Sequence, residues 1–267
     1  KLNKSSLQAT IAALIIAITP WHIHYSRSIT DPIIAFCFLS LGFWAWLSDQ
    51  GYIKILGAFF LVLSMYTYNS SRLFVPLLLI TYFLVYFKGH YQNIIKYYRW
   101  PLIVLFIGLI TITYLSLFTH VGSRASSVLI FNKPEIVDQV NEGIFRSKTL
   151  GLGSLRIFNN KVIISSWEVI RRYLLHYQFD FLFFQNNLGP RHAFSKQGNL
   201  LLITLPLLLF GLYVSLRRLS KEDIFFGFWL VLAGIPAALT TDVPHSGRTL
   251  IMLPALLYFI CQGLMKI

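Results

Sequence analysis

The sequence predicts an all-α protein: a polytopic bundle of about eight transmembrane helices with one large extracytoplasmic loop. Hydrophobic residues make up 56% of the 267 residues and charged residues only 12%, whereas a soluble domain carries about 25% charged residues. The mean hydropathy is +0.64. This composition excludes a disordered chain, a nucleic-acid-binding domain built on a charged surface and an ordinary soluble enzyme.

Apolar stretches of nearly bilayer-crossing length predict the spans in chain order. Several are shorter than the roughly 20 residues that cross a bilayer. Flanking aromatic and basic residues such as Trp44, Tyr66 and Trp100 are expected to extend them into the interface. We treat residues 1–267 as part of one transmembrane domain. The stretches lie near residues 7–22, 32–47, 53–68, 73–87, 101–118, 199–216, 223–240 and 250–264.

Basic residues predict the orientation, because Lys and Arg gather in short loops on the cytoplasmic side. With the N-terminus inside, only Arg27, Arg72 and Arg248 fall in short outside connections. The segment 119–198 is too long to obey this rule. We therefore expect a multi-pass protein of the inner (plasma) membrane with its functional site on the extracytoplasmic face. The inside residues are Lys1, Lys4, Lys54, Lys88, Lys96, Arg99, Arg217, Arg218, Lys221 and Lys266.

The extracytoplasmic loop, residues 119–198, has helical segments of its own. Lys133-Pro134-Glu135 predicts a helix start. Residues 161–184 follow an amphipathic pattern with Arg171 and Arg172 opposite the apolar side. This helix either lies in the interface with its basic face toward lipid phosphates or packs on the bundle as a cap. Its apolar side holds Val162, Ile163, Trp167, Ile170, Leu174 and Leu175, and a second polar set, expected to be solvated, holds His176, Asp180, Arg191 and His192.

Arg27, Arg72 and Arg248 are the first candidate binding residues, because each lies near the end of a predicted span on the same side. A guanidinium group suits a phosphate, with which it forms paired charge-assisted hydrogen bonds. A lipid-linked phosphate or diphosphate is the anion found at that depth. The alternative is that each arginine extends to lipid headgroups.

Asp31 is the acidic residue nearest to Arg27 in the sequence. Because Pro32 follows it, Asp31 suits the N-cap of the next helix. It could instead accept hydrogen bonds from sugar hydroxyls, or hold Arg27 if the turn between them is helical. These roles are compatible with one another.

Three histidines, His22, His24 and His245, are candidates for metal binding or acid–base chemistry, and alternatively for hydrogen bonding to headgroups. No third ligand follows His22 and His24 at a fixed spacing, so we predict no metal and no cofactor. Cys37 and Cys261 lie inside apolar stretches and are interpreted as small hydrophobic residues.

Four ordered motifs carry a family resemblance that covers nearly the whole chain. They are Pro20–Arg27 (PWHIHYSR), Tyr66–Leu73 (YTYNSSRL), Phe179–Phe184 (FDFLFF) with Arg191-His192 after it, and Pro244–Arg248 (PHSGR) before Leu253-Pro254-Ala255. Together they resemble bacterial members of the protein O-mannosyltransferase-like family (dolichyl-phosphate-mannose-protein mannosyltransferase-like). That family belongs to the C-type (GT-C) membrane glycosyltransferases.

The resemblance implies a transmembrane enzyme that transfers a sugar, with inversion, from a polyprenyl-phosphate donor to a protein, lipid or glycan acceptor. It implies no cofactor, and membrane lipids as neighbours. In the family the general base is an acidic residue of the first outside loop. No such acid precedes Asp31, so we expect the chain to be N-terminally incomplete and the base to lie before Lys1. Asp31 then has a supporting catalytic role, and the donor's phosphate and sugar are bound by Arg27, Arg72, His24, His245 and Arg248.

Two other functions remain open at this point. A flippase or transporter for lipid-linked glycans would use the same arginines only to bind the diphosphate. A polysaccharide polymerase or ligase would use the same class of donor. An ion-coupled transporter is disfavoured, because the predicted spans carry almost no ionisable residues away from their ends.

Overall fold

The computed structural model describes residues 6–87, 91–119, 130, 134–149, 159–184 and 197–266, and every regular element in them is a helix. The expectation of an all-α fold is confirmed. The bundle is formed by α1 (Ser6–Ile18), α2 (Pro20–Ser28), α3 (Asp31–Trp46), α4 (Gly51–Thr67), α5 (Asn69–Tyr86), α6 (Tyr91–Phe118), α10 (Thr204–Arg218), α11 (Lys221–Ala233), α12 (Ile235–Ala238), α13 (Ser246–Thr249), η4 (Leu250–Met252) and α14 (Leu253–Leu264).

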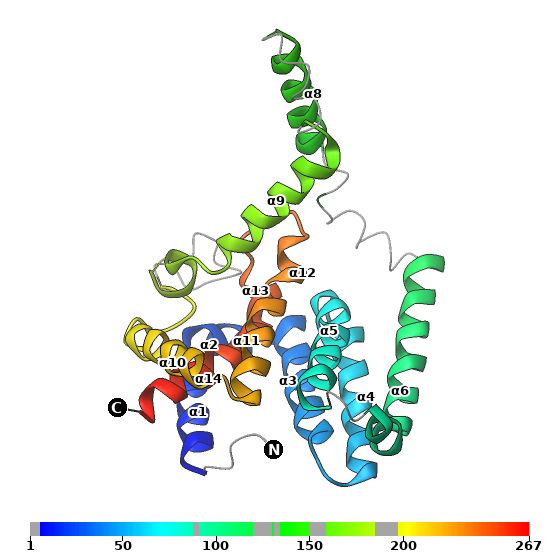
Figure 1. Cartoon of the computed structure of the whole chain (residues 1–267), viewed down its shortest axis with the longest axis vertical. Coiled ribbons are helices and arrows are strands. Elements are labelled where there is room, and N and C mark those ends of the chain that lie inside the picture. The colour runs from blue at the N-terminus through cyan, green and yellow to red at the C-terminus, as the bar shows by residue number, and fades with distance from the viewer. Residues whose placement is uncertain are drawn as a thin grey trace.

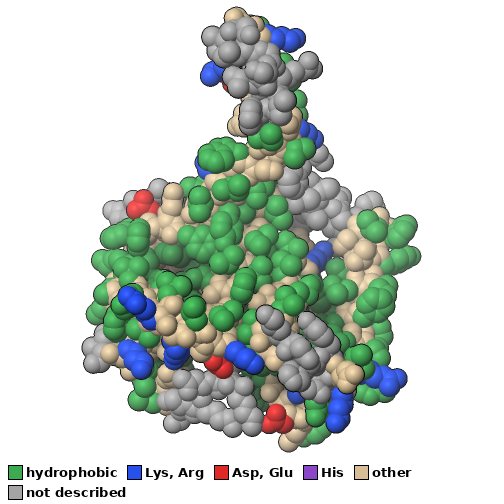
Figure 2. Space-filling model, viewed as in Figure 1, with side chains coloured by type: hydrophobic (Ala, Val, Ile, Leu, Met, Phe, Trp, Pro, Cys, Tyr) green, Lys and Arg blue, Asp and Glu red, His purple; other side chains and the backbone are tan. Residues whose placement is uncertain are grey.

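Three helical stretches are long and apolar enough to cross a membrane: Asn69–Tyr86, Ile94–Phe118 and Ser246–Leu264. A fourth arises if α1 and α2, which are bent by 62° at Thr19, count as one broken span. The helices α3 and α4 are apolar but shorter. The chain therefore has the helices of a membrane protein, while the expected number of eight spans is not confirmed by helix length. Figure 2 shows hydrophobic side chains over the middle of one face, with basic side chains gathered below them.

The helix α2 is the element that the sequence analysis missed, because its polar residues were expected to form a loop. Pro20 occupies its first turn, where a missing N–H costs no hydrogen bond. The helix ends at Ser28 and is capped by Ile29, whose φ of 44° is left-handed, and α3 begins two residues after Ile29. This short helix buries Trp21 and Tyr25 on one side.

Glycines allow the bundle helices to approach closely. A Cβ added at Gly57 would lie 2.7 Å from the backbone nitrogen of Trp46, which shows how tightly α4 crosses α3. At the crossing of α10 and α14, a Cβ at Gly211 would lie 1.8 Å from the carbonyl oxygen of Phe259. Small residues at such crossings are typical of helices packed in membranes.

The connection between α6 and α10 holds α8 (Pro134–Thr149), α9 (Lys161–Leu175) and the π-helical turn η3 (Asp180–Phe184), which we call the connecting segment. In Figure 1, α9 rises from the bundle and α8 projects beyond it. The predicted helix start at Pro134 is confirmed. The prediction of one helix over 161–184 is wrong in its length, because α9 ends at Leu175 and η3 forms separately.

Candidate functional site

The candidate site lies where α2 meets residues 240–249, which we call the site loop. The indole Nε1 of Trp21 donates to the carbonyl oxygen of Ser246 at 3.0 Å. The hydroxyl groups of Tyr25 and Ser246 lie 2.8 Å apart. Both bonds are buried, and Ser246 is itself fully buried, so these contacts fix α2 to the site loop.

Arg248 is the central charge of this site. Its Nη1 donates to the Thr240 hydroxyl at 2.7 Å and to the Asp242 carbonyl at 3.3 Å, and its Nη2 lies 3.6 Å from the Asp242 carboxylate. Only 14% of the side chain is exposed, whereas Asp242 is largely in solvent. The guanidinium is therefore held in place by one loop while its balancing carboxylate is mostly hydrated.

Tyr68, between α4 and α5, brings a second element to Arg248. Its half-buried phenol lies close enough to Arg248 to be affected by the positive charge of the guanidinium. The Asp31 carboxylate also acts electrostatically on this phenol, and Tyr25 lies within the same range. Arg248, Tyr68, Tyr25 and Asp31 thus lie near one another, although they come from three separate stretches of the chain.

The structure corrects the expected local role of Asp31. The N-cap of α3 is Thr30, and Asp31 is the first helical residue, with its side chain exposed. No ion pair joins Asp31 to Arg27, although both side chains are described. The left-handed Ile29 separates them, so the helical i to i+4 spacing does not apply. Arg27 lies in the last turn of α2 with an exposed side chain.

Arg72 has a separate set of partners. Its Nε donates to the carbonyl oxygen of Met65 at 3.1 Å, and its Nη1 lies 3.4 Å from the Ser116 hydroxyl. Met65 is in the last turn of α4, where helical carbonyls lack helical donors. Arg72 therefore joins α5 to α4 and α6, and no contact that the structure describes links it to Arg248 or Arg27.

The histidines, like the arginines, have different neighbours. The ring of His24 packs edge-on against Tyr25, with centroids 5.2 Å apart. His245 is buried and accepts the backbone N–H of Arg248 through Nδ1 at 3.3 Å, which caps the short helix α13. Among the residues that the structure describes, no group of three His, Cys, Asp or Glu side chains could hold a metal ion. Arg191 and His192 lie outside the described residues.

The connecting segment holds the site loop through residues that sequence reasoning did not select for the site. Arg172 Nη1 donates to the carbonyl oxygens of Thr240 and Thr241 at 2.8 and 2.7 Å. Glu168 accepts from Arg172 Nε at 2.7 Å, and hydrogen bonding from Arg171 holds the pKa of Glu168 below its usual value. The fixed spacing of Glu168 and Arg172, four residues apart, was the available signal.

His176 was expected to be solvated and is instead fully buried. Its Nε2 accepts the backbone N–H of His245 at 3.2 Å, and its ring packs edge-on against Phe181 at 5.7 Å. Burial lowers the pKa of His176 to about 4, so the ring is neutral at physiological pH. A neutral imidazole with a free Nε2 lone pair is the form that this hydrogen bond requires.

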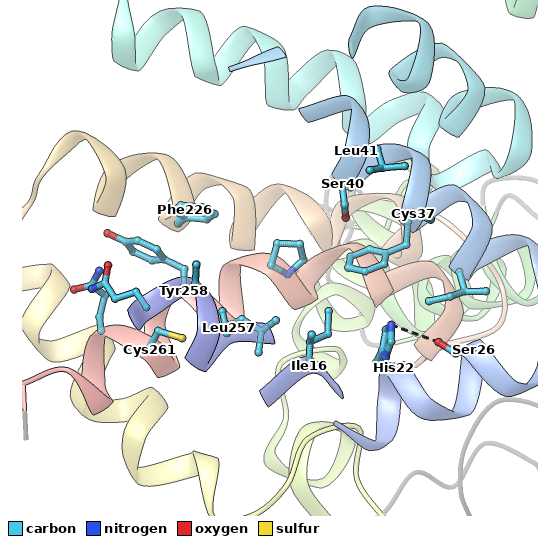
Figure 3. A pocket seen from close by; sticks show the side chains of 17 residues that line it. Ile16, His22, Ser26, Cys37, Ser40, Leu41, Phe226, Leu257, Tyr258 and Cys261 are labelled. Atoms are coloured by element: carbon cyan, nitrogen blue, oxygen red, sulfur yellow. Dashed lines mark hydrogen bonds between the residues drawn. The ribbon is translucent and has the colours of Figure 1, made fainter. Parts of the chain in front are cut away.

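A groove of about 740 Å³ lies between α1, α2, α3, α11 and α14, on another side of α2 from the contacts with the site loop. Figure 3 shows His22 and Ser26 at one end and Tyr258 and Cys261 at the other, with Ile16 and Leu257 between them. His22 Nε2 and Ser26 Oγ are 3.4 Å apart. Apart from these ends, the lining is mostly apolar. It is thus His22, and not the predicted His24, that faces the groove.

Comparison with known proteins gives no independent assignment. No family model, no curated protein and no solved structure matches this chain.

Proposed function

We propose that this protein is a GT-C type membrane glycosyltransferase that crosses the plasma membrane about eight times, with its N-terminal end inside. It takes a sugar from a polyprenyl-phosphate donor on the extracytoplasmic face and transfers it, with inversion, to a protein, lipid or glycan hydroxyl. The family resemblance motivates this proposal, and the arrangement of α2 supports it.

The two sides of α2 carry the argument. Trp21 and Tyr25 bind the site loop that holds Arg248, whereas His22 and Ser26 line the apolar groove. One nine-residue helix therefore borders both a polar, cationic cluster and a long apolar groove. A ligand that fits both has an anionic head and a long hydrocarbon chain, which describes a polyprenyl phosphate. The groove lies between bundle helices that carry exposed apolar side chains, and we propose that the hydrocarbon chain enters it from lipid.

Arg248 and Tyr68 are proposed to bind the donor phosphate. A guanidinium and a phenol hydroxyl both donate to phosphate oxygens, and they stabilise the charge that develops when phosphate leaves the anomeric carbon. Asp31, exposed beside them, is proposed to accept hydrogen bonds from sugar hydroxyls. His245 positions the backbone of Arg248. Arg27, His24 and Arg72 remain proposed contacts of the donor, although Arg72 also binds the Met65 carbonyl and the Ser116 hydroxyl.

Transfer of radiolabelled sugar tests the proposal. The complete gene product in nanodiscs is given a panel of polyprenyl-phosphate sugars and acceptors, and Arg248→Ala is compared with Arg146→Ala. Arg146 is a matched control because it forms an exposed pair with Glu142, with 72% of its side chain in solvent. We expect loss of transfer for Arg248→Ala alone. Equal transfer by both variants would refute the site, and donor binding without transfer would favour a flippase.

Protection of Cys37 tests the groove separately. This cysteine is exposed in the groove wall, whereas Cys261 is buried there. We expect polyprenyl phosphate to slow alkylation of Cys37 by a membrane-permeant maleimide, and polyprenol without phosphate to protect it less. Unchanged alkylation with every lipid would show that the groove does not hold the donor chain.

A further inference from the structure

The helix α9 presents its apolar side outward. Val162, Trp167 and Leu174 are 74%, 68% and 57% exposed, and Ile170 between them is also exposed. In water these side chains would be expected to turn toward the protein core. Several large apolar side chains on one face of a helix indicate that the face meets an apolar partner.

The polar side of α9 is the buried one. Ser165 and Glu168 are buried, and Arg172 reaches the carbonyl groups of the site loop. The hydroxyl groups of Tyr173 and Tyr177 donate to the carbonyls of Val231 and Leu230 near the C-terminal end of α11. These polar contacts fix the rotation of α9, so its apolar face cannot turn inward without breaking them.

Exposed apolar side chains also lie on α11, next to the end of α9. Phe228 and Val231 of α11 are exposed close to the points where the hydroxyl groups of Tyr173 and Tyr177 bind. Lipid covers such side chains on a bundle that crosses a membrane. A helix attached to the end of α11 meets the same solvent at the edge of the bilayer. In Figure 2, hydrophobic side chains extend from the body toward the projecting region.

We propose that α9 is an amphipathic helix inserted in the membrane surface over the candidate site. Its apolar face enters the acyl region of the leaflet nearest to the site, and its polar face holds the site loop. Trp167 lies on this apolar face, and aromatic side chains are favoured near the junction of acyl chains and headgroups. The site loop then lies at the depth of the lipid headgroups, and its ligand reaches it through the lipid phase. This inference is independent of sugar transfer.

Fluorescence of Trp167 tests the proposal. Wild type and Trp167→Phe are reconstituted into vesicles of phosphatidylcholine and phosphatidylglycerol with either ordinary or brominated acyl chains. The difference between the two proteins gives the emission of Trp167. We expect brominated lipid to quench this emission and iodide in the buffer to leave it unchanged. Quenching by iodide alone would overturn the proposal, and protection from both quenchers would overturn it in favour of a second copy of the chain covering α9.

A matched pair of variants gives a second measurement of Trp167 quenching. The double variant Ile170→Glu with Leu174→Glu places carboxylates on the apolar face, whereas Arg171→Gln changes a neighbouring side chain at its edge. We expect the double variant to make Trp167 accessible to iodide and Arg171→Gln to leave it quenched by brominated lipid. Equal behaviour of the two would contradict the insertion of this face. If the double variant does not fold, the Trp167 measurement on wild type decides alone.

Discussion

Replacing Arg172 with Ala removes the contact that joins α9 to the site loop. The guanidinium donates to the carbonyls of Thr240 and Thr241 and to Glu168, and only 20% of the side chain is exposed. A hydrogen bond that involves a charged group contributes about 1.5–3 kcal/mol. Counting only the two carbonyl bonds at the lower end, we expect a loss of about 3 kcal/mol. For a chain of 267 residues this corresponds to a decrease in Tm of about 5 °C.

Arg171→Ala is the matched control, because Arg171 binds the same carboxylate without reaching the site loop. Its Nη2 and Nε lie 2.6 and 2.8 Å from the Glu168 oxygens, and 53% of the side chain is exposed. Exposed ion pairs contribute about 0–1 kcal/mol, so its Tm should fall by less than about 2 °C.

Thermal unfolding in detergent and amide hydrogen exchange over residues 240–249 measure both effects. We expect faster exchange in this loop for Arg172→Ala, and an unchanged rate for Arg171→Ala. Equal Tm values and equal exchange in the two variants would refute the reasoning, because the two arginines share Glu168 and differ in their contact with the loop.

Two further predictions concern packing and pH. Gly263→Ala should destabilise the α10–α14 crossing by about 3 kcal/mol or more, because the new Cβ would lie 2.0 Å from the carbonyl oxygen of Leu207. Gly227 has open space around it, so Gly227→Ala should leave the Tm nearly unchanged. Equal Tm values for the two variants would refute the close crossing. His176 should make stability fall as pH decreases from 6.5 to about 4, because there the unfolded chain binds a proton that the folded ring does not. The free energy of unfolding falls by about 3 kcal/mol over this range, and His176 causes no loss above pH 6.5. We expect this loss to disappear in His176→Gln. An unfolding free energy with the same pH dependence in that variant would contradict the burial of a neutral His176 ring.

The helical class of the protein followed from its sequence because long apolar stretches without charge have few alternatives. The helix α2 did not follow from it. Its polar residues hid the helical period in the sequence. In the structure Trp21 and Tyr25 face the site loop, whereas His22 and Ser26 face the groove. That pattern has meaning only when the site loop and the groove lie on different sides of the helix. Both come from distant parts of the chain, so no local signal could identify them.

The arginines show a similar limit. Arg72 and Arg248 have the same position in the sequence pattern, each a few residues from the end of an apolar stretch. In the structure Arg72 supplies a donor to a free carbonyl in the last turn of α4, whereas Arg248 is held in a loop beside Tyr68. Sequence pattern gives the depth of a charge in the membrane. The direction of its side chain depends on which unsatisfied backbone groups lie within reach.

The orientation of α9 depends on its solvent in the same way. A period of 3.6 residues shows that Val162, Trp167 and Leu174 share a face, but it does not show whether that face is inside or outside. In water the hydrophobic effect would bury it. Beside a bilayer that preference disappears, and the buried face is chosen by hydrogen bonds, here those that Arg172 and His176 make with the site loop. A helix whose polar side is buried and whose apolar side is exposed is therefore consistent with lipid as its solvent, as the proposed insertion of α9 requires.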